Sequence, residues 1–293
     1  MSESWARAAG AWAARCCGAL ALACLLWPGP SQAQGSPPFT AATWNLRLDT
    51  SSDGPNAWPH RRDAVRALIR WHGFDLLGTQ EAMAHQVDDL EALTEFGRTG
   101  VGRDDGARGG EFAAIFYRRS RFALQAEGTF WLSPTPDRPS MGWDARCCKR
   151  IASWARLQDR ATGRSFVVVS AHFDHEGVVA RRESARLLLR QVATLAAGLP
   201  VVCLGDLNAT PESEPVQLMT AVLADARAIS ATPPYGPVGT FNGFKLDAPL
   251  TDRIDYVFVS PGVRVLKYGV LSDSIDRLYP SDHHPVVVQL QID

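Results

Sequence analysis

Short apolar runs rich in β-branched residues alternate with stretches of helical periodicity, and this alternation constrains the fold of the chain most strongly. The pattern predicts strands that are joined by helices at some points and by hairpins at others, as at the turn Thr162-Gly163. We find no repeat and no linker that would divide the chain. We therefore expect an α/β domain built on mixed rather than purely parallel sheets.

The predicted elements follow one another along almost the whole chain. The helix at 178–197 is the clearest, because Leu187, Leu188, Val192 and Leu195 recur with the 3.6-residue period. The other helices are expected at 61–71, 84–96 and 214–223, and the strands at 39–48, 75–79, 111–117, 122–132, 151–157, 166–171, 201–204, 254–259, 263–268 and 285–290.

The first 33 residues have the pattern of a secretory signal peptide. Arg7 and Arg15 precede the uncharged apolar run 18–27, and Ser31-Gln32-Ala33 offers the small residues that a signal peptidase reads. The run is shorter than the roughly 20 residues that a membrane-spanning helix needs. We expect a signal peptide at 1–33 and one domain at 34–293, secreted or periplasmic, monomeric and without a stable membrane span.

The charge balance argues against one class of partner. The whole chain has 30 Lys and Arg residues against 31 Asp and Glu residues, and removal of Glu3, Arg7 and Arg15 leaves 28 against 30, a net charge of −2. Tight, non-specific binding of nucleic acid depends on neutralising phosphates with Lys and Arg. The balance therefore gives no electrostatic footprint for tight, non-specific nucleic-acid binding, although it permits a local basic cleft.

Three cysteines remain after residue 33, and an odd number leaves at least one free thiol in an oxidising compartment. Cys203 lies in the apolar run 201–204 and is expected to be a small buried hydrophobe. Cys147 and Cys148 are adjacent, and two readings stay open, a vicinal disulfide or two free thiols. No cysteine spacing indicates a zinc site.

Polar residues stand at the ends of several apolar runs, where a neutral core would exclude them. Residues two apart in an extended chain point the same way, so each strand end can offer two polar groups to one cleft. Oxygen ligands without a Cys/His cluster suit Mg²⁺ rather than Zn²⁺. A metal ion beside a histidine can promote the attack of water on a phosphorus centre. The residues are Asn45, Glu81, His172 with Asp174, Asp206 with Asn208, Arg253 with Asp255, and Asp282 with His283.

Six short motifs in this order resemble the endonuclease/exonuclease/phosphatase superfamily. They are Trp44-Asn45, Gln80-Glu81, Ser170-Ala171-His172, Gly205-Asp206-Leu207-Asn208, Arg253-Ile254-Asp255-Tyr256 and Ser281-Asp282-His283-His284-Pro285. They span nearly all of the chain after residue 33. The resemblance implies a four-layer α/β sandwich of two packed mixed β-sheets flanked by helices, like DNase I, and it is closest to an exported bacterial branch near the deadenylase-type members.

The resemblance also implies roles for individual residues. Glu81 would be the principal ligand of Mg²⁺, for which Mn²⁺ can substitute, supported by Asn45 and Asp282. Asp206 and Asn208 would position the attacking water and the phosphate. His283 would pair with Asp255, which holds its ring and favours its charged form, and His172 would donate to a phosphate oxygen.

Three further residues are candidates for contact with the substrate. Arg47 stands where the DNA-repair branch of the superfamily has an Asp, so it either touches a substrate phosphate or forms an ion pair at the rim. Glu111 opens a predicted strand and either lines the cleft or does not. Asn242 lies in a loop that either reaches the substrate or is a plain turn. His175 and His284 are expected to face away from the chemistry.

These inferences predict a secreted, Mg²⁺-dependent phosphoesterase without an organic cofactor, and a phosphodiesterase in particular. Its substrate would be a phosphoester of lipid, glycan or nucleic acid. One alternative is a nuclease, either like a 3′–5′ exoribonuclease or like DNase. A second alternative, from another class, is a non-catalytic module that binds phosphorylated ligands, but the intact Glu81, Asp206 and His283 argue against it.

Overall fold

The computed structural model describes residues 37–293, in which two six-stranded sheets pack face to face. The predicted signal peptide at 1–33 lies outside the described residues. The first sheet has the order β11 (Val263–Val270), β12 (Val286–Ile292), β1 (Phe39–Asn45), β2 (Leu76–Gln80), β4 (Ile115–Arg118), β3 (Phe96–Thr99). The second has the order β5 (Phe122–Trp131), β6 (Ile151–Asp159), β7 (Ser165–His172), β8 (Val201–Asp206), β10 (Asp255–Val259), β9 (Ala224–Asp225).

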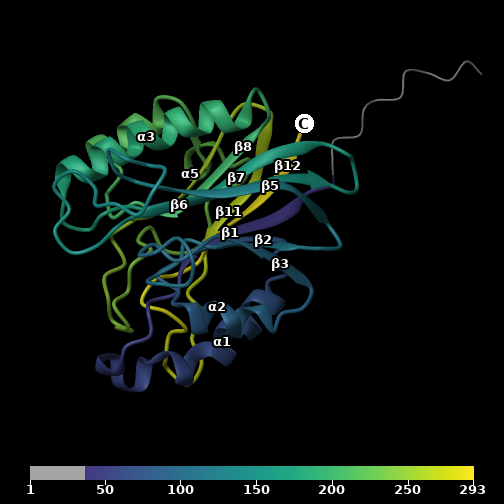
Figure 1. Ribbon diagram of the computed structural model, residues 1–293. Coiled ribbons are helices and arrows are strands. Elements are labelled where there is room, and N and C mark those ends of the chain that lie inside the picture. Colours follow the sequence, from purple (N-terminus) through teal and green to yellow (C-terminus); the bar gives the residue numbers. More distant parts are fainter. Residues whose placement is uncertain (1–36) are drawn as a thin grey trace, which may run out of the picture. The chain divides into compact units, whose positions relative to one another are not determined.

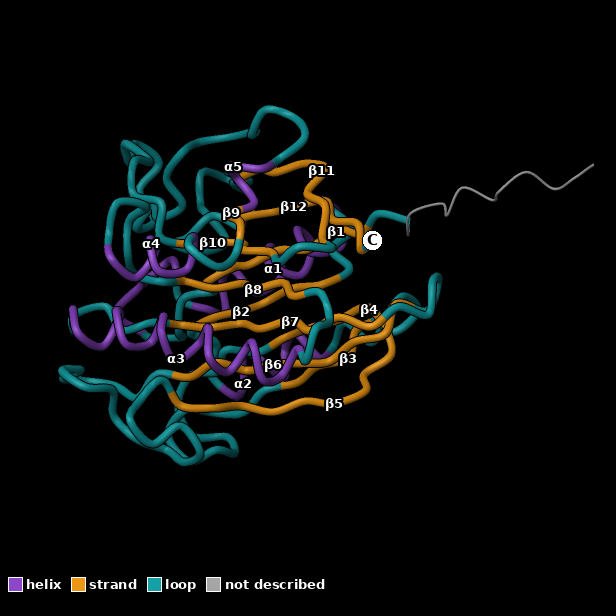
Figure 2. Tube along the Cα trace, turned by 90° about the horizontal axis from the view of Figure 1, so that it is seen from above, coloured by secondary structure: helices purple, strands orange, loops and turns teal. Residues whose placement is uncertain are grey.

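Helices cover the outer face of each sheet (Figure 1). On the first sheet they are α1 (Trp58–Trp71) and α2 (Ala84–Glu91), preceded by a 3₁₀ helix at Ser51–Asn56. On the second they are α3 (Val178–Ala196) and α4 (Glu214–Thr220), with α3 crossing the outer face of its sheet (Figure 2). The short helix α5 (Ala226–Ile229) instead contacts β10 and β11, one strand of each sheet, and its Ala226 packs in the central core. The four-layer α/β sandwich is therefore confirmed. No helix within residues 37–293 is both long enough and apolar enough to cross a membrane.

Each sheet contains one parallel pair of strands at its centre. These pairs are β1 with β2 and β7 with β8, whereas the neighbouring ladders are antiparallel. The two pairs lie against each other, because β1 contacts β8 and β2 contacts β7 across the sandwich. Their carboxyl ends meet at one edge, where the side chain of Asn45 donates to that of Asp206 over 3.0 Å.

Strand alternation separates three hydrophobic layers. In β1, Phe39 and Ala41 face the second sheet and belong to the central core, whereas Ala42 and Trp44 pack under α1. In β8, Val202 and Leu204 face the first sheet, and Cys203 faces α3 and α4. One core lies between the sheets and one lies under each pair of helices, so each sheet buries both of its faces.

Most predicted elements are confirmed, and the differences fall on short segments. The helix predicted at 84–96 ends at Glu91, and the four-residue strand β3 follows it. The strand predicted at 111–117 becomes regular only at Ile115. Strand β9 and helix α5 were not predicted, because two and four residues are too few to show a period.

Candidate active site

Alternation along the strands turns several polar side chains into the space between the two sheets. Val202 and Leu204 of β8 face the central core, so Asp206 points in the same direction. The same rule brings His172 in from β7 and Asp255 in from β10, and the register places both His172 and Asp255 directly opposite Asp206. All three are buried, so the hydrophobic core gives way here to a polar cluster.

A belt of neutral polar groups lies between the core and this cluster. The amide nitrogen of Gln80 donates to Ser170 Oγ over 3.1 Å and to Thr43 Oγ1 over 3.2 Å, which joins the two sheets. Ser170 Oγ in turn donates to the carbonyl of Thr79 over 3.3 Å. The belt fixes the spacing of the sheets beneath the charged groups. It also gives hydrogen-bond partners to buried polar atoms that would otherwise have none.

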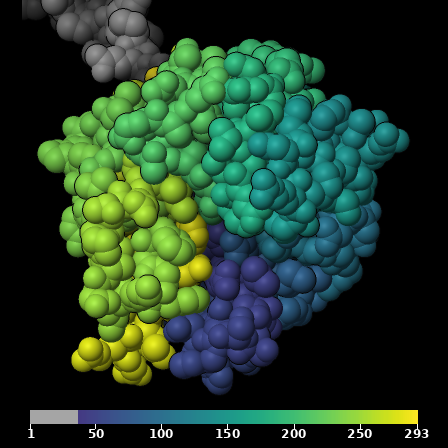
Figure 3. Space-filling view, turned by 90° about the vertical axis from the view of Figure 1, so that its left-hand side faces the viewer, coloured from purple at the N-terminus to yellow at the C-terminus, as the bar shows by residue number. Residues whose placement is uncertain are grey.

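The polar cluster opens into a cleft of about 460 Å³ at the edge where the parallel strands end. Figure 3 looks onto this edge, and a hollow lies near the centre, where the purple, teal and yellow parts of the chain meet. The cleft is lined by Arg47, Leu48, Glu81, Arg103, Glu111, Cys148, Arg150, His172, His175, Asp206, Asn208, Phe241, Ile254, Asp282 and His283.

Asn45 holds two carboxylates of the cleft together. Its Nδ2 donates to Glu81 Oε1 over 2.9 Å and to Asp206 Oδ2 over 3.0 Å. The other carboxylate oxygen of Glu81 accepts from the backbone N–H of Leu48 over 3.2 Å. Asn45 therefore joins Glu81, which follows β2 of the first sheet, to Asp206 on the second.

Three residues of the cleft adopt left-handed backbone conformations that usually favour glycine. They are Arg47 (φ 56°), Glu81 (φ 64°) and Asn208 (φ 46°), and each follows the end of a central strand. Such a conformation costs on the order of 1–3 kcal/mol at a residue with a side chain. The surrounding hydrogen bonds hold these turns, as where Asn208 N–H donates to Asp206 Oδ1 over 2.8 Å.

His283 and Asp255 form a buried pair. His283 Nδ1 lies 2.9 Å from Asp255 Oδ2, and its Nε2 lies 3.9 Å from Asp206 Oδ2. Burial opposes the charged form of the ring, but the neighbouring carboxylates, Asp255 first among them, outweigh burial and raise the pKa of His283 well above its ordinary value. The ring is thus held in one orientation and charged near neutral pH, as a donor to an anion requires.

The carboxyl groups of the cleft are crowded and poorly solvated. Burial, and then repulsion from Asp255, raise the pKa of Asp206 to about 7. Burial likewise raises the pKa of Asp282. Glu81 and Asp206, together with His172, also present ligand atoms within 4.8 Å of one another. A divalent cation would relieve this crowding, and hard oxygen donors are the ligands that Mg²⁺ and Mn²⁺ take, so the residues fit such an ion.

Arg47 lies beside two of the predicted metal ligands. Its guanidinium makes a two-pronged ion pair with Asp53, with distances of 3.0 and 3.1 Å. It also lies 4.0 Å from Glu81 Oε2 and 3.8 Å from Asp282 Oδ2. Of the two readings of Arg47, the structure contains the rim ion pair, and the same side chain borders the cleft.

A basic group also lines the cleft. The Arg150 guanidinium is buried, with Nη1 2.9 Å from His172 Nε2 and Nη2 2.7 Å from His175 Nδ1. Asn208 Nδ2 also approaches His172 Nε2, at 3.2 Å. Burial, and then the positive charge of Arg150, hold the pKa of His172 well below its ordinary value, so this ring is neutral at physiological pH.

Glu111 lines the same cleft, where it pairs with a second arginine. Arg103 Nη1 donates to Glu111 Oε2 over 2.6 Å, and His172 Nδ1 lies 3.7 Å from the same oxygen. Burial raises the pKa of Glu111 to about 7 although Arg103 opposes the shift. Glu111 therefore lies in the wall of the cleft, and its contact with a substrate stays a prediction.

Three polar residues near the motifs do not line the cleft. Asn242 is buried and donates to the carbonyl of Ser281 over 3.1 Å, so it supports the segment that carries His283. Arg253 does not share the direction of Asp255, because it pairs with Asp225 at 2.7 Å over the outer face. The Asp174 Oδ1 atom accepts from the N–H groups of Glu176 and Gly177 and thereby turns the chain after β7.

Arg103, Arg150 and His175 were missed from the sequence. Arg150 directly precedes β6, which runs antiparallel to β7, so its start lies at the same edge as the end of β7. A search for polar residues at strand starts as well as strand ends would have found it. His175 was expected to face away, but the turn made by Asp174 brings its ring to Arg150.

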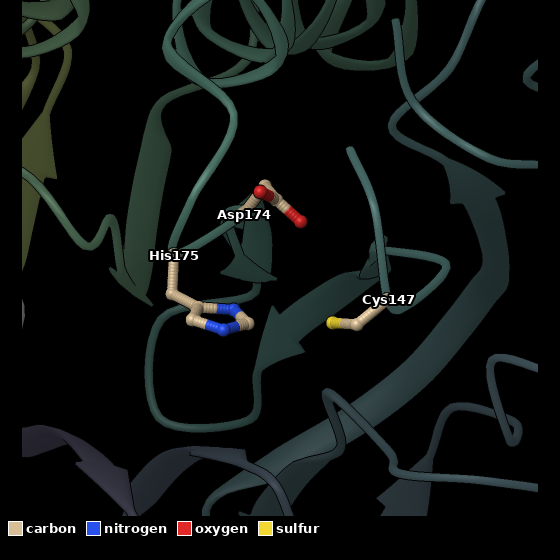
Figure 4. A group of neighbouring side chains, drawn as sticks. All are labelled: Cys147, Asp174 and His175. Carbon is tan, nitrogen blue, oxygen red and sulfur yellow. The ribbon is translucent and has the colours of Figure 1, made fainter. Parts of the chain in front are cut away.

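Cys147 and Cys148 form a disulfide, and Cys203 is a buried free thiol, as its apolar run predicted. Cys147 Sγ lies within 4.8 Å of ligand atoms of Asp174 and His175, and Figure 4 shows the sulfur turned towards the His175 ring. A disulfide sulfur is not a thiolate, so these three residues do not form a metal site in this state. Cys148 contributes to the wall of the cleft.

Two packed mixed sheets with outer helices, and an acidic and histidine-bearing cleft at one edge, define a protein of the DNase I-like class. The chain belongs to the endonuclease/exonuclease/phosphatase family, whose model matches residues 42–283. Endonucleases, exonucleases and phosphatases are hydrolases that act on phosphoester bonds. The predicted superfamily is thus confirmed, whereas the exported bacterial branch stays a prediction.

Known proteins of this family are similar over most of the chain. An endonuclease/exonuclease/phosphatase from Bacteroides vulgatus is 38% identical, with a TM-score of 0.84 over 88% of this chain and 100% of that one. A mannosyl-6-phosphatase from Bacteroides thetaiotaomicron is 39% identical, with a TM-score of 0.82 over 86% of this chain and 99% of that one. Nocturnin from Drosophila melanogaster is 27% identical over 221 residues, which are 63% of this chain and only 33% of Nocturnin.

Proposed function

We propose that this protein is an exported, Mg²⁺- or Mn²⁺-dependent phosphatase that hydrolyses the phosphate monoester of a sugar to the free sugar and inorganic phosphate. The observation that carries the proposal is Arg150, which is 5% exposed and lines the same cleft as Glu81 and Asp206. The carboxylate that pairs with it, Asp174, lies 3.6 Å from Nε, beyond hydrogen-bond length. A buried guanidinium whose ion pair is longer than a hydrogen bond keeps N–H groups for a further anion, and a phosphate in the cleft would supply one.

The positively charged groups of the cleft favour a phosphate monoester over a phosphodiester, because the monoester carries more negative charge. A terminal phosphate monoester is close to a dianion at neutral pH, whereas a diester carries a single charge. The cleft offers Arg150, charged His283 and the amide of Asn208 to such an anion. The sequence alone favoured a phosphodiester, but this positive wall and the similarity to a mannosyl-6-phosphatase favour the monoester of a sugar.

The residues of the cleft can divide the reaction between them. Asp206, with a pKa near 7, can accept a proton from the attacking water, while the Asn208 amide orients the water and the phosphate. His283, charged and oriented by Asp255, donates to a phosphoryl oxygen as negative charge builds up. Neutral His172 can add a further N–H to the same anion.

Glu81, with Asn45 and Asp282, would hold the divalent cation. The ion, when bound, supplies positive charge that polarises the phosphoryl oxygens. Asn45 connects Glu81 to Asp206, so a change at the metal ligand also reaches the proton acceptor. For this reason we expect loss of the ion to abolish turnover rather than to slow it.

Export is part of the proposal and rests on two features. The segment 1–33 has the pattern of a signal peptide. The Cys147–Cys148 disulfide also fits an oxidising compartment, because thiols in the cytosol are kept reduced. N-terminal sequencing of the exported protein should find a start near Gln34, and a form that retains residues 18–27 would contradict cleavage.

The substrate proposal is tested by the rate of phosphate release with Mg²⁺ from a panel of hexose 6-phosphates, a sugar phosphodiester, RNA, DNA and sphingomyelin. We expect kcat/KM to be highest for a sugar monoester. Arg150→Ala should lower kcat/KM for that monoester about 10- to 100-fold, the loss of one or two charge-assisted hydrogen bonds. Arg138→Ala, which alters an exposed arginine outside the cleft, is the matched control. A higher kcat/KM for any of the diesters would reject the monoester assignment.

A further inference from the structure

The loop between β5 and β6 carries Arg150 into the cleft and is anchored at both ends. At one end, the Asp144 carboxylate accepts from the backbone N–H groups of Val179 over 3.1 Å and Ala180 over 2.6 Å, at the start of α3. At the other end, the carbonyl of Arg150 accepts from the N–H of Leu132 over 2.7 Å. Residues 145–149 must span the distance between these two anchors.

Hydrogen bonds do little to fix this span. Within residues 37–293, Arg146, Cys147 and Cys148 make no hydrogen bond, and Lys149 reaches outward to the carbonyl of Asp104 over 3.0 Å. The Cys147–Cys148 bond is therefore the main constraint on the middle of the span. A bond between adjacent cysteines closes a small ring that includes their shared peptide bond. The ring restricts the backbone dihedrals of both residues, so less conformational entropy is lost when the loop adopts one conformation.

The disulfide lies next to the groups that would receive the phosphate. Cys148 lines the cleft, and Cys147 faces the ring of His175 (Figure 4). The same ring takes the Nη2 contact of Arg150 at 2.7 Å. Because Arg150 has no carboxylate within hydrogen-bond length, its place in the cleft depends on the backbone that precedes it and on the two histidines that it touches.

We propose that the Cys147–Cys148 disulfide is a positioning element that holds Arg150 against His175 in the geometry that binds the phosphate of the substrate. This inference rests on the proposed function, because it assigns Arg150 to the phosphate. Without the bond, residues 146–148 sample more conformations, and Arg150 binds the anion in only a fraction of them. The loss then falls on phosphate affinity and KM much more than on kcat, because the groups that transfer protons are on other elements.

Reduction of the wild-type protein offers an independent way to remove the bond. Cys147 is exposed, so a dithiol can reach it. The dithiol attacks the disulfide and loses two electrons and two protons to become a disulfide itself, while Cys147 and Cys148 become two thiols. Reduction should therefore reproduce the effect of replacing both cysteines without any change of sequence.

The experiment is calorimetric binding of inorganic phosphate to the Mg²⁺-loaded protein, alongside KM and kcat for a sugar phosphate. We expect the C147A/C148A double variant and the dithiol-reduced wild type each to bind phosphate about tenfold more weakly, as when one charge-assisted hydrogen bond is weakened. The dithiol should have no effect on phosphate binding by the double variant. This variant is the matched control, because it lacks the disulfide and would reveal any other effect of the dithiol.

A second background separates positioning from a general structural effect. In Arg150→Ala protein, removal of both cysteines should cost no further phosphate affinity, because the residue that they position is absent. A further tenfold loss in that background would overturn the inference, and so would equal affinity of the wild type with and without its disulfide. Absence of phosphate binding to the unmodified wild type would instead overturn the proposed function itself, and the inference with it.

Discussion

At the scale of single residues, burial decides the chemistry of the cleft, and Asp206 is the clearest case. It lies between Asp255 and His172 on neighbouring strands, and Asn45 donates to it from the other sheet. In water an aspartate is ionised above a pH of about 4. In this cluster its pKa rises to about 7, so a group that would be an inert anion becomes a proton acceptor poised near neutral pH.

This shift predicts a pH dependence of stability in metal-free protein. Because Asp206 binds its proton more tightly when folded than when unfolded, the folded state holds more protons between about pH 4 and pH 7. The contribution of Asp206 to the free energy of unfolding therefore falls as pH rises through this window and levels off above about pH 7. The fall amounts to about 1.4 kcal/mol for each unit by which the pKa is raised.

Asp206→Asn should remove this contribution while keeping the size of the side chain. We expect the midpoint of thermal unfolding in EDTA to fall less between pH 5 and pH 8 in the variant than in the wild type. His172 contributes in the opposite direction in both proteins, because its lowered pKa makes stability rise with pH up to about 6.5. Parallel curves for the two proteins would show that Asp206 is ionised throughout.

Some residues of the cleft could be predicted from the sequence, and others could not. Glu81, Asp206 and His283, which line the cleft, could be predicted, because each interrupts an apolar pattern at a strand end or within a motif. Arg150 was not found, since an arginine in a loop is ordinarily a solvated surface residue. Its burial arises only when the start of β6 meets the end of β7, a tertiary contact without a local signal.

At the scale of elements, strand pairing sets the distances within the cleft. The fold could be predicted where periodicity runs long, as in α3, which ends within one residue of the predicted bound. It could not be predicted for β3, whose residues Phe96–Thr99 include a glycine and are too few to alternate. The stability of β3 comes instead from pairing with β4, and that partner is not visible in its own sequence.

Gly205 shows how an element controls the site, because it lets β7 and β8 approach closely. A Cβ atom at Gly205 would lie 2.4 Å from the carbonyl oxygen of Ala171 on β7, the residue opposite in the register. Gly205→Ala should therefore lower the free energy of unfolding by about 1–3 kcal/mol, as overpacking of a tight interior does. It should also lower kcat, since the next pair in the register is His172 and Asp206.

Gly269 in β11 provides the matched control for this substitution. A Cβ atom there would make ordinary contacts at 3.6 Å with Tyr235, and neither residue lines the cleft. Gly269→Ala should change the free energy of unfolding by less than about 0.5 kcal/mol and leave kcat unchanged. Urea unfolding and steady-state kinetics of both variants check these expectations, and equal stability of the two would show that β7 and β8 can separate at little cost.

At the scale of the whole molecule, the site exists only when the two sheets are packed. The first sheet supplies Asn45 from β1, Glu81 after β2 and His283 before β12, and the second supplies Asp206 and Asp255. Neither half carries both the principal predicted metal ligand and the predicted proton acceptor. We therefore expect hydrolysis by this chain to require the packed sandwich, a bound metal ion and His283.

The most direct test is the rate of phosphate release from a sugar phosphate as a function of free Mg²⁺, for metal-stripped wild type, Glu81→Gln and His283→Ala. Wild-type turnover should vanish in EDTA and return with Mg²⁺ or Mn²⁺. Glu81→Gln should need at least about tenfold more Mg²⁺ for half-maximal rate, the usual scale for a lost or altered metal-site group. His283→Ala should keep the wild-type Mg²⁺ requirement and lose about 10²- to 10⁴-fold in kcat, with Asp255→Asn between it and the wild type. Full turnover of metal-free wild type, or near-normal kcat in His283→Ala, would contradict hydrolysis that depends on a metal and on His283.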